Sequence, residues 1–123
     1  MGGAAMDGEA RVAGFLAGSP GAKAWQDPSS GRWLGTVPVD EVRWLATRAA
    51  GSAGALAGAL EELAGAVAQV LAIEAGFPGW TARRRVDGRW TAVRGTGPGF
   101  PAARAGDADG LQAEIRRVAA GTP

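Results

Sequence analysis

The stretch ALAGALEELAGAVAQVLAIEA, residues 55–75, decides how the rest of this chain is interpreted. Large apolar side chains recur in it at spacings of four, three, four and three residues, which is the pattern of an amphipathic helix. These residues are Leu56, Leu60, Leu63, Val67 and Val70. Gly76 follows as a residue that ends a helix, and Pro78 cannot continue it. The pattern therefore predicts one long helix over residues 55–75.

This leucine seam has two interpretations. It is either the buried face of a single domain or the contact with a second helix of another chain. Small residues beside it permit close helix approach: Gly54, Ala57, Gly58, Ala64, Gly65 and Ala68. The sheet that the sequence predicts is only two or three strands wide, so we expect one helix face to stay uncovered. We therefore predict self-association, as a homodimer or with another protein, through the five seam residues.

Residues N-terminal to the seam predict a further helical region. Asp40, after Pro38, has the character of an N-cap, and Val42 and Leu45 begin an apolar face. The glycines of residues 51–54 are expected to break or bend the helix, because each costs about 1 kcal/mol relative to Ala.

The first third of the chain is rich in glycine and alanine. Residues 1–24 are expected to be a flexible segment, with at most one or two helical turns at 12–16. Residues 27–31, Asp-Pro-Ser-Ser-Gly, predict a turn between Trp25 and Trp33, in a small hairpin or an aromatic-pinned loop. We assign these tryptophans and Trp44 to the core, with an exposed recognition site at Trp25 and Trp33 as the alternative.

The chain changes character after the helix. Residues 80–94 predict two strands joined at Asp87-Gly88, a pair typical of a type I′ turn. Residues 100–105 are a candidate third strand. A last helix is predicted from Asp109, whose spacing to Gln112 is that of a capping box. Its buried face is formed by Leu111, Ile115 and Val118. Gly-Arg-Trp occurs at both 31–33 and 88–90, which we interpret as shared turn chemistry and not as a repeat.

Together these elements predict an α+β fold. The long amphipathic helix and the C-terminal helix pack on a small antiparallel β-hairpin or three-stranded sheet. The domain organisation that follows is a flexible segment over 1–24 and a single small domain over 25–123.

The C-terminal half also resembles a family. Phe77-Pro-Gly-Trp80, Gly88-Arg-Trp90 and the Asp109-x-Leu111-x-x-x-Ile115 pattern are similar to those of short uncharacterised actinobacterial proteins. The resemblance implies this architecture and an actinobacterial host, and it implies no activity. Residues 78–91 are also similar to a short actinobacterial domain of unknown function that is often found beside membrane segments.

Arginine dominates residues 80–105, where six arginines accompany one carboxylate, that of Asp87. The local charge is +5 in a chain of net charge +1, which leaves −4 for the other residues. Arginine interleaved with tryptophan is typical of surfaces that bind phosphates and stacked bases. The candidate anion- or nucleic-acid-binding residues are Arg83, Arg85, Arg89, Trp90 and Arg94. The alternatives are a solvated sheet face with arginine stacked on Trp90, and an acidic protein partner.

The composition closes most routes to catalysis. The chain has no Cys, no His and no Tyr, so it lacks thiolate chemistry, the commonest general base and the commonest metal ligand. We expect no enzyme activity, no cofactor and no metal. The most apolar stretch, residues 49–60, is shorter than the roughly 20 residues of a spanning helix, so we expect a cytoplasmic protein without a membrane partner.

The sequence therefore predicts a small non-enzymatic interaction or accessory module that self-associates through the 55–75 helix. The alternative is a nucleic-acid-binding protein that uses the arginine-rich hairpin 80–94.

Overall fold

A computed structural model of the chain describes residues 3–95 and 101–121. The chain divides into two compact units, Met1–Val67 and Ala68–Pro123. The described residues form three helices and two three-stranded antiparallel sheets, which confirms the predicted α+β class. The division differs from the expected single domain over 25–123, because residues that we assigned to loop and helix build a sheet of their own.

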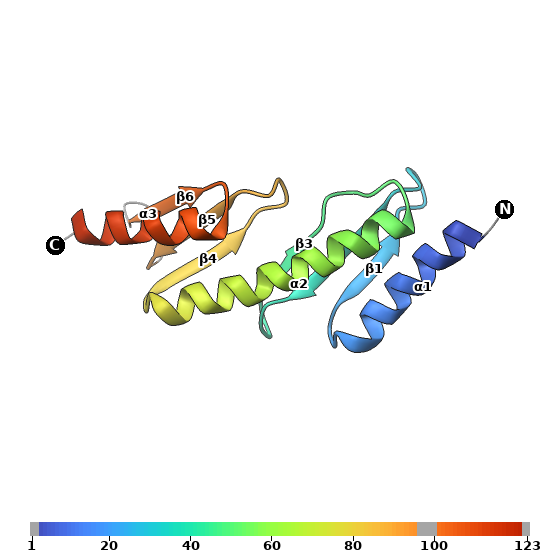
Figure 1. Ribbon diagram of the computed structural model, residues 1–123, viewed down its shortest axis with the longest axis horizontal. Helices are drawn as coiled ribbons and strands as arrows, with labels where there is room; N and C mark the ends of the chain where they lie inside the picture. The colour runs from blue at the N-terminus through green and yellow to red at the C-terminus, as the bar shows by residue number, and fades with distance from the viewer. Residues whose placement is uncertain (1–2, 96–100, 122–123) are drawn as a thin grey trace. The chain divides into compact units, whose positions relative to one another are not determined.

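The first unit begins with a helix and a three-stranded sheet. Helix α1 (Gly3–Gly18) precedes β1 (Lys23–Gln26), β2 (Trp33–Pro38) and β3 (Trp44–Ala46), which pair in the order β1-β2-β3. Helix α2 (Ala53–Gly76) follows, and its part up to Val67 belongs to this unit. Figure 1 shows α1 beside β1, and these two elements are in contact.

Helix α1 replaces the flexible segment that was expected over residues 1–24. Its packing explains why a glycine-rich stretch is helical. Gly8 lies against α2 so closely that an added Cβ would stand 2.5 Å from the backbone nitrogen of Gly54. Val12, one turn further along α1, is buried. Glycine therefore permits a close helix approach here, and the approach offsets its low helix propensity.

Helix α2 packs against the first sheet at Gly35 in the middle strand. A Cβ added to Gly35 would lie 2.7 Å from Cδ2 of Leu60, 3.1 Å from the carbonyl oxygen of Lys23 and 3.4 Å from Cδ1 of Leu56. The Gly35 N–H donates to the buried Thr47 hydroxyl at 3.0 Å, and the Thr47 N–H donates to the Gly35 carbonyl at 2.9 Å. The helix can approach the sheet only because β2 has no side chain at this point.

The helical region predicted after Pro38 is wrong. Asp40 does not cap a helix, because its Oδ1 accepts the N–H groups of Val42 and Arg43, each at 2.9 Å, and so closes a turn. The chain then forms β3, in which Leu45 is buried opposite Val37. The three residues of β3 alternate between the exposed and the buried side of the sheet, which is the period of a strand. The helical spacing of Val42 and Leu45 had favoured a helix instead.

The start and end of α2 agree with the long-helix prediction. Ser52 is its N-cap, because the Ser52 hydroxyl accepts the N–H of Ala55 at 3.1 Å. The helix ends at Gly76. By length and composition, α2 is also the one helix of the described residues that could cross a membrane. Residues 49–60 alone are too short for this, so the apolar helix is longer than we assumed from the sequence. A core helix of a soluble protein has the same properties, and localisation stays a prediction.

The second unit continues from the end of α2. Strands β4 (Trp80–Arg84), β5 (Trp90–Arg94) and β6 (Ala102–Ala105) pair in the order β4-β5-β6, and helix α3 (Ala108–Gly121) follows. Figure 1 shows α3 along β5 and β6, which it contacts. Leu111 and Ile115 are fully buried and Val118 is half-buried. The hairpin, the third strand and the last helix are confirmed, although Phe100 lies outside the described residues.

Two local details differ from the predictions. The hairpin loop has three residues, 86–88, and only Gly88 has a positive φ, whereas a type I′ turn needs two such residues. The N–H of Gly88 donates to the carbonyl of Arg85, which closes the loop. The N-cap of α3 is Asp107 and not Asp109, because Asp107 Oδ1 accepts the N–H of Gly110 at 2.6 Å.

The Gly-Arg-Trp echo belongs to a repeated arrangement. Each unit has a helix followed by three antiparallel strands in chain order, and each Gly-Arg-Trp segment leads from a positive-φ glycine into the middle strand. Trp25 and Arg83 occupy equivalent positions in the two sheets. Trp25 pairs with Leu34, the residue after Trp33, and Arg83 pairs with Thr91, the residue after Trp90. The interpretation as shared turn chemistry alone therefore understated the similarity.

The contact at Gly35 generates the first prediction. Gly35→Ala should lower the free energy of unfolding by about 1–3 kcal/mol, because the added methyl overpacks a core contact. The matched control is Gly65→Ala on α2, where a Cβ meets nothing within 4 Å and the change should stabilise by up to about 1 kcal/mol. Urea unfolding of the three proteins measures both values. An unchanged stability of Gly35→Ala would show that α2 does not rest on β2 at this point.

Candidate functional site

The leucine seam lies inside the chain's own fold. Leu56, Leu60 and Val70 have no exposed surface, Leu63 is 1% exposed, and Val67 is half-buried. The expectation of an uncovered helix face assumed one small sheet. In the structure, residues 23–46 form the first sheet, which was not expected and which packs on α2 at Gly35. The seam is therefore core in this structure, and a self-association surface must be sought on other residues.

The outer face of the first sheet carries two exposed tryptophans. Ala24 pairs with Gly35 on the side of the sheet that faces α2, so the neighbouring Trp25 points to the opposite side. Trp44 lies on this same outer side, because its neighbour Leu45 is buried. Trp25 is 45% exposed and Trp44 is 63% exposed. These two residues are therefore not core, in contrast to our assignment, whereas Trp33 is half-buried.

A hollow of about 900 Å³ lies between these tryptophans. It is lined by Pro20, Gly21, Lys23, Trp25, Thr36, Pro38, Val39, Asp40, Glu41, Arg43 and Trp44. Its charged residues balance, with Lys23 and Arg43 against Asp40 and Glu41. The N–H of Val42 and the Arg43 guanidinium, whose Nε lies 2.8 Å from Oδ2, lower the pKa of Asp40. We call this apolar surface with its mixed charges the tryptophan face.

The outer face of the second sheet is basic instead. Arg83, Thr91 and Arg104 stand opposite one another across β4, β5 and β6. Arg85 and Arg89 close the hairpin next to this row, where the Arg85 N–H donates to the Arg89 carbonyl at 2.7 Å. All four arginines are exposed. We call this surface the arginine face.

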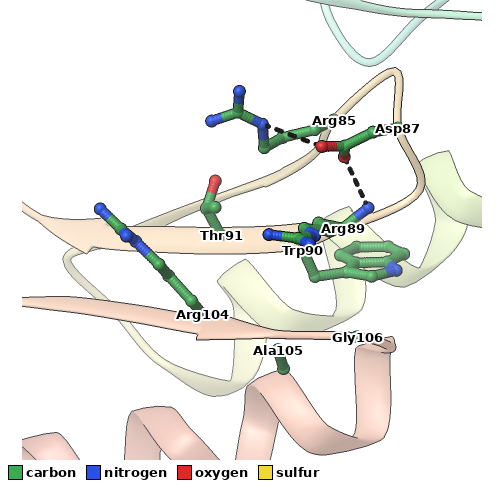
Figure 2. Close-up of a pocket in the computed structure, with 8 residues that line it drawn as sticks. All are labelled: Arg85, Asp87, Arg89, Trp90, Thr91, Arg104, Ala105 and Gly106. Atoms are coloured by element: carbon green, nitrogen blue, oxygen red, sulfur yellow. Dashed lines mark hydrogen bonds and ion pairs between the residues drawn. The ribbon is translucent and has the colours of Figure 1, made fainter.

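A hollow of about 460 Å³ opens on the arginine face, and Figure 2 shows its lining. The residues are Arg85, Asp87, Arg89, Trp90, Thr91, Arg104, Ala105 and Gly106. In Figure 2 the Arg85 and Arg104 side chains extend on the same side as the Thr91 hydroxyl. The carboxylate of Asp87 lies 3.9 Å from Nε of Arg85 and accepts the N–H of Arg89 at 3.0 Å. It is the one acidic side chain among the described residues that line this hollow.

The structure separates the predicted anion-binding residues into two groups. Arg83, Arg85 and Arg89 share the outer face, because alternate residues of a strand point to the same side. Arg94 pairs with Trp80 on the inner side and is half-buried. Trp90 is only 4% exposed, so its ring has no free face for a stacked base. Arg104 was not among the candidates, and it joins them because β6 pairs with β5.

No protein-family model, curated protein or solved structure matches this chain. The resemblance to short actinobacterial proteins therefore stays an expectation based on residues alone. Within the part of the chain that the structure describes, no group of three or more His, Cys, Asp or Glu side chains is placed to hold a metal ion. The two outer sheet faces are therefore the candidate functional surfaces.

The exposure of the tryptophans generates a second prediction. In protein dilute enough to be monomeric, acrylamide should quench Trp25 and Trp44 strongly, because they are exposed in the single chain, and should quench the buried Trp80 and Trp90 weakly. Trp44→Phe should therefore remove an accessible part of the fluorescence, whereas Trp80→Phe, the matched control, should remove a protected part. Stern–Volmer plots measure these fractions. A protected Trp44 in dilute protein would mean that another surface covers it.

Proposed function

We propose that this protein is a non-enzymatic interaction module that works as a homodimer in the cytoplasm and uses the tryptophan face as its contact. The observation that carries the proposal is the pair of exposed tryptophans at one apolar hollow, Trp25 at 45% and Trp44 at 63% exposure. The contact thus moves from the leucine seam, which the chain buries itself, to the outer side of the first sheet.

The chemistry of tryptophan supports a protein contact here. A tryptophan buries roughly 150–250 Å² when it is covered, and it is enriched among residues that dominate binding energy. Two such side chains next to Pro20 and Pro38 offer a large apolar area with little conformational entropy to lose. An exposed apolar patch with polar residues at its rim is typical of interaction sites.

The charges at the rim favour a second copy as the occupant. A two-fold symmetric interface uses the same patch on both subunits, so that patch must complement itself. The tryptophan face has an apolar centre and carries both signs of charge, with Lys23 and Arg43 against Asp40 and Glu41. Asp40 and Arg43 already pair with each other at 2.8 Å within the chain, so the charges left at the rim are those of Lys23 and Glu41. In a two-fold arrangement Lys23 of one copy can lie near Glu41 of the other, which a partner with one dominant charge sign does not offer.

The third prediction concerns the mass of the protein in solution. Trp44→Ser should weaken dimerisation roughly a thousandfold, because truncation of a hot-spot residue costs about 2 kcal/mol and a two-fold interface contains that residue twice. Trp25→Ser should act in the same direction. Light-scattering mass on a sizing column, over a concentration series, measures the dissociation.

Two exposed apolar residues elsewhere provide matched controls. Leu71→Gln on α2 and Val93→Ser on β5 remove side chains that are 46% and 42% exposed, and neither should change the dimer. A wild-type monomer at every concentration would contradict the proposal. Dissociation caused by Leu71→Gln alone would move the contact to the outer side of α2.

A further inference from the structure

We infer that the arginine face holds a site for a phosphate monoester group, centred on Arg85, Arg89 and Arg104. This site is independent of the proposed homodimer, since none of its residues lines the tryptophan face. Its ligand is a dianionic phosphoryl group, either on a small metabolite or on a phosphorylated protein side chain.

The number and kind of donors at the hollow favour a phosphoryl group. Three guanidinium groups and the Thr91 hydroxyl line one hollow of about 460 Å³. Each guanidinium is a planar fork of N–H donors that matches phosphate oxygens, and it keeps its charge at every physiological pH. Three forks around one hollow suit a tetrahedral dianion with several oxygens better than a carboxylate, which has only two.

The positive charges of these donors are only weakly neutralised. The ion pair between Arg85 and Asp87 spans 3.9 Å, and both side chains are largely exposed, at 61% and 42%. Asp87 also accepts the N–H of Arg89, a contact that holds the hairpin loop together. One carboxylate cannot balance three guanidinium groups, so the described hollow keeps a positive charge that an anion relieves.

The surroundings of the hollow favour a compact phosphate over a nucleic acid strand. The only ring that lines the described hollow is that of Trp90, which is 4% exposed and therefore not a stacking platform. Outside residues 80–105 the second unit carries four carboxylates against two arginines, a net charge of −2, so a long polyanion would meet repulsion beyond the arginine face. Both observations favour a small group bound in the hollow over a strand that runs across the surface.

The repeat supplies a control variant. Arg32 stands between Gly31 and Trp33 in the first hairpin, as Arg89 stands between Gly88 and Trp90 in the second. Both side chains are exposed, and only Arg89 lines the basic hollow. Arg32→Gln and Arg89→Gln therefore make the same chemical change in equivalent hairpins, and only Arg89→Gln removes a proposed ligand contact.

The test is a titration of the full chain with inorganic phosphate at constant ionic strength, followed by the arginine Nε–Hε signals in ¹⁵N NMR spectra. We expect saturable shifts of the Arg85, Arg89 and Arg104 signals. Arg89→Gln and Arg104→Gln should each weaken binding roughly tenfold, because hydrogen bonds between charged groups are the strong ones. Arg32→Gln should bind as the wild type does. Thermal unfolding of each variant checks that the fold is intact.

The sources of the group are distinguished by two further probes. Adenosine monophosphate and a phosphoserine peptide are compared with adenosine and the unphosphorylated peptide, and the tighter phosphorylated probe identifies the source. The inference is overturned if chloride at equal ionic strength causes the same shifts, or if Arg32→Gln weakens binding as much as Arg89→Gln. It is equally overturned if a DNA duplex binds while phosphate shifts no arginine signal.

Discussion

The contact between α2 and Gly35 of β2 is the constraint on which the first unit depends. A Cβ added at Gly35 would stand 2.7 Å from Cδ2 of Leu60 and 3.1 Å from the carbonyl oxygen of Lys23, so a larger residue fits only if the Leu60 side chain and strand β1 give way. Because this approach is so close, Leu56 and Leu60 are enclosed by the first sheet, and the seam becomes core. The contact at one glycine in a strand therefore makes the N-terminal part of the leucine seam, Leu56 and Leu60, an internal face.

The repeated arrangement of helix and three strands explains how one small chain presents two different surfaces. In both units the middle strand has a small buried residue on its inner side, which is Gly35 in the first unit and Ala92 in the second. The outer sides face solvent and are free to differ. Trp25 and Arg83 occupy equivalent register positions, and one contributes to an apolar face and the other to a basic one. The scaffold is thus shared, whereas the chemistry is carried by the solvent side.

Several carboxylates stabilise local backbone structure through hydrogen bonds. Asp27 accepts the Ser29 N–H and the hydroxyls of Ser29 and Ser30 in the first hairpin loop, which lowers its pKa. Asp107 caps α3, and Glu74 accepts the N–H of Ala82 at 2.8 Å on the edge strand β4. Such roles hold local structure in place. They agree with a binding module whose contacts lie on sheet faces.

The sequence by itself determined the elements that local rules specify. The spacing of Leu56 to Val70 set helix α2, Asp87-Gly88 set the second hairpin, and the alternation of its strands placed Arg84 opposite in direction to Arg83 and Arg85. Only the tertiary structure decided what covers these elements. Strand β3 has three residues and α1 is rich in glycine, so neither has a local signal strong enough to compete with the alternatives, and both are stabilised by packing. For the same reason the exposure of Trp44, the burial of Trp90 and the position of Arg104 across β5 from Arg83 could not be read from the sequence. Each depends on which strands pair and which side of a sheet a helix covers, and these are contacts between residues far apart in the chain.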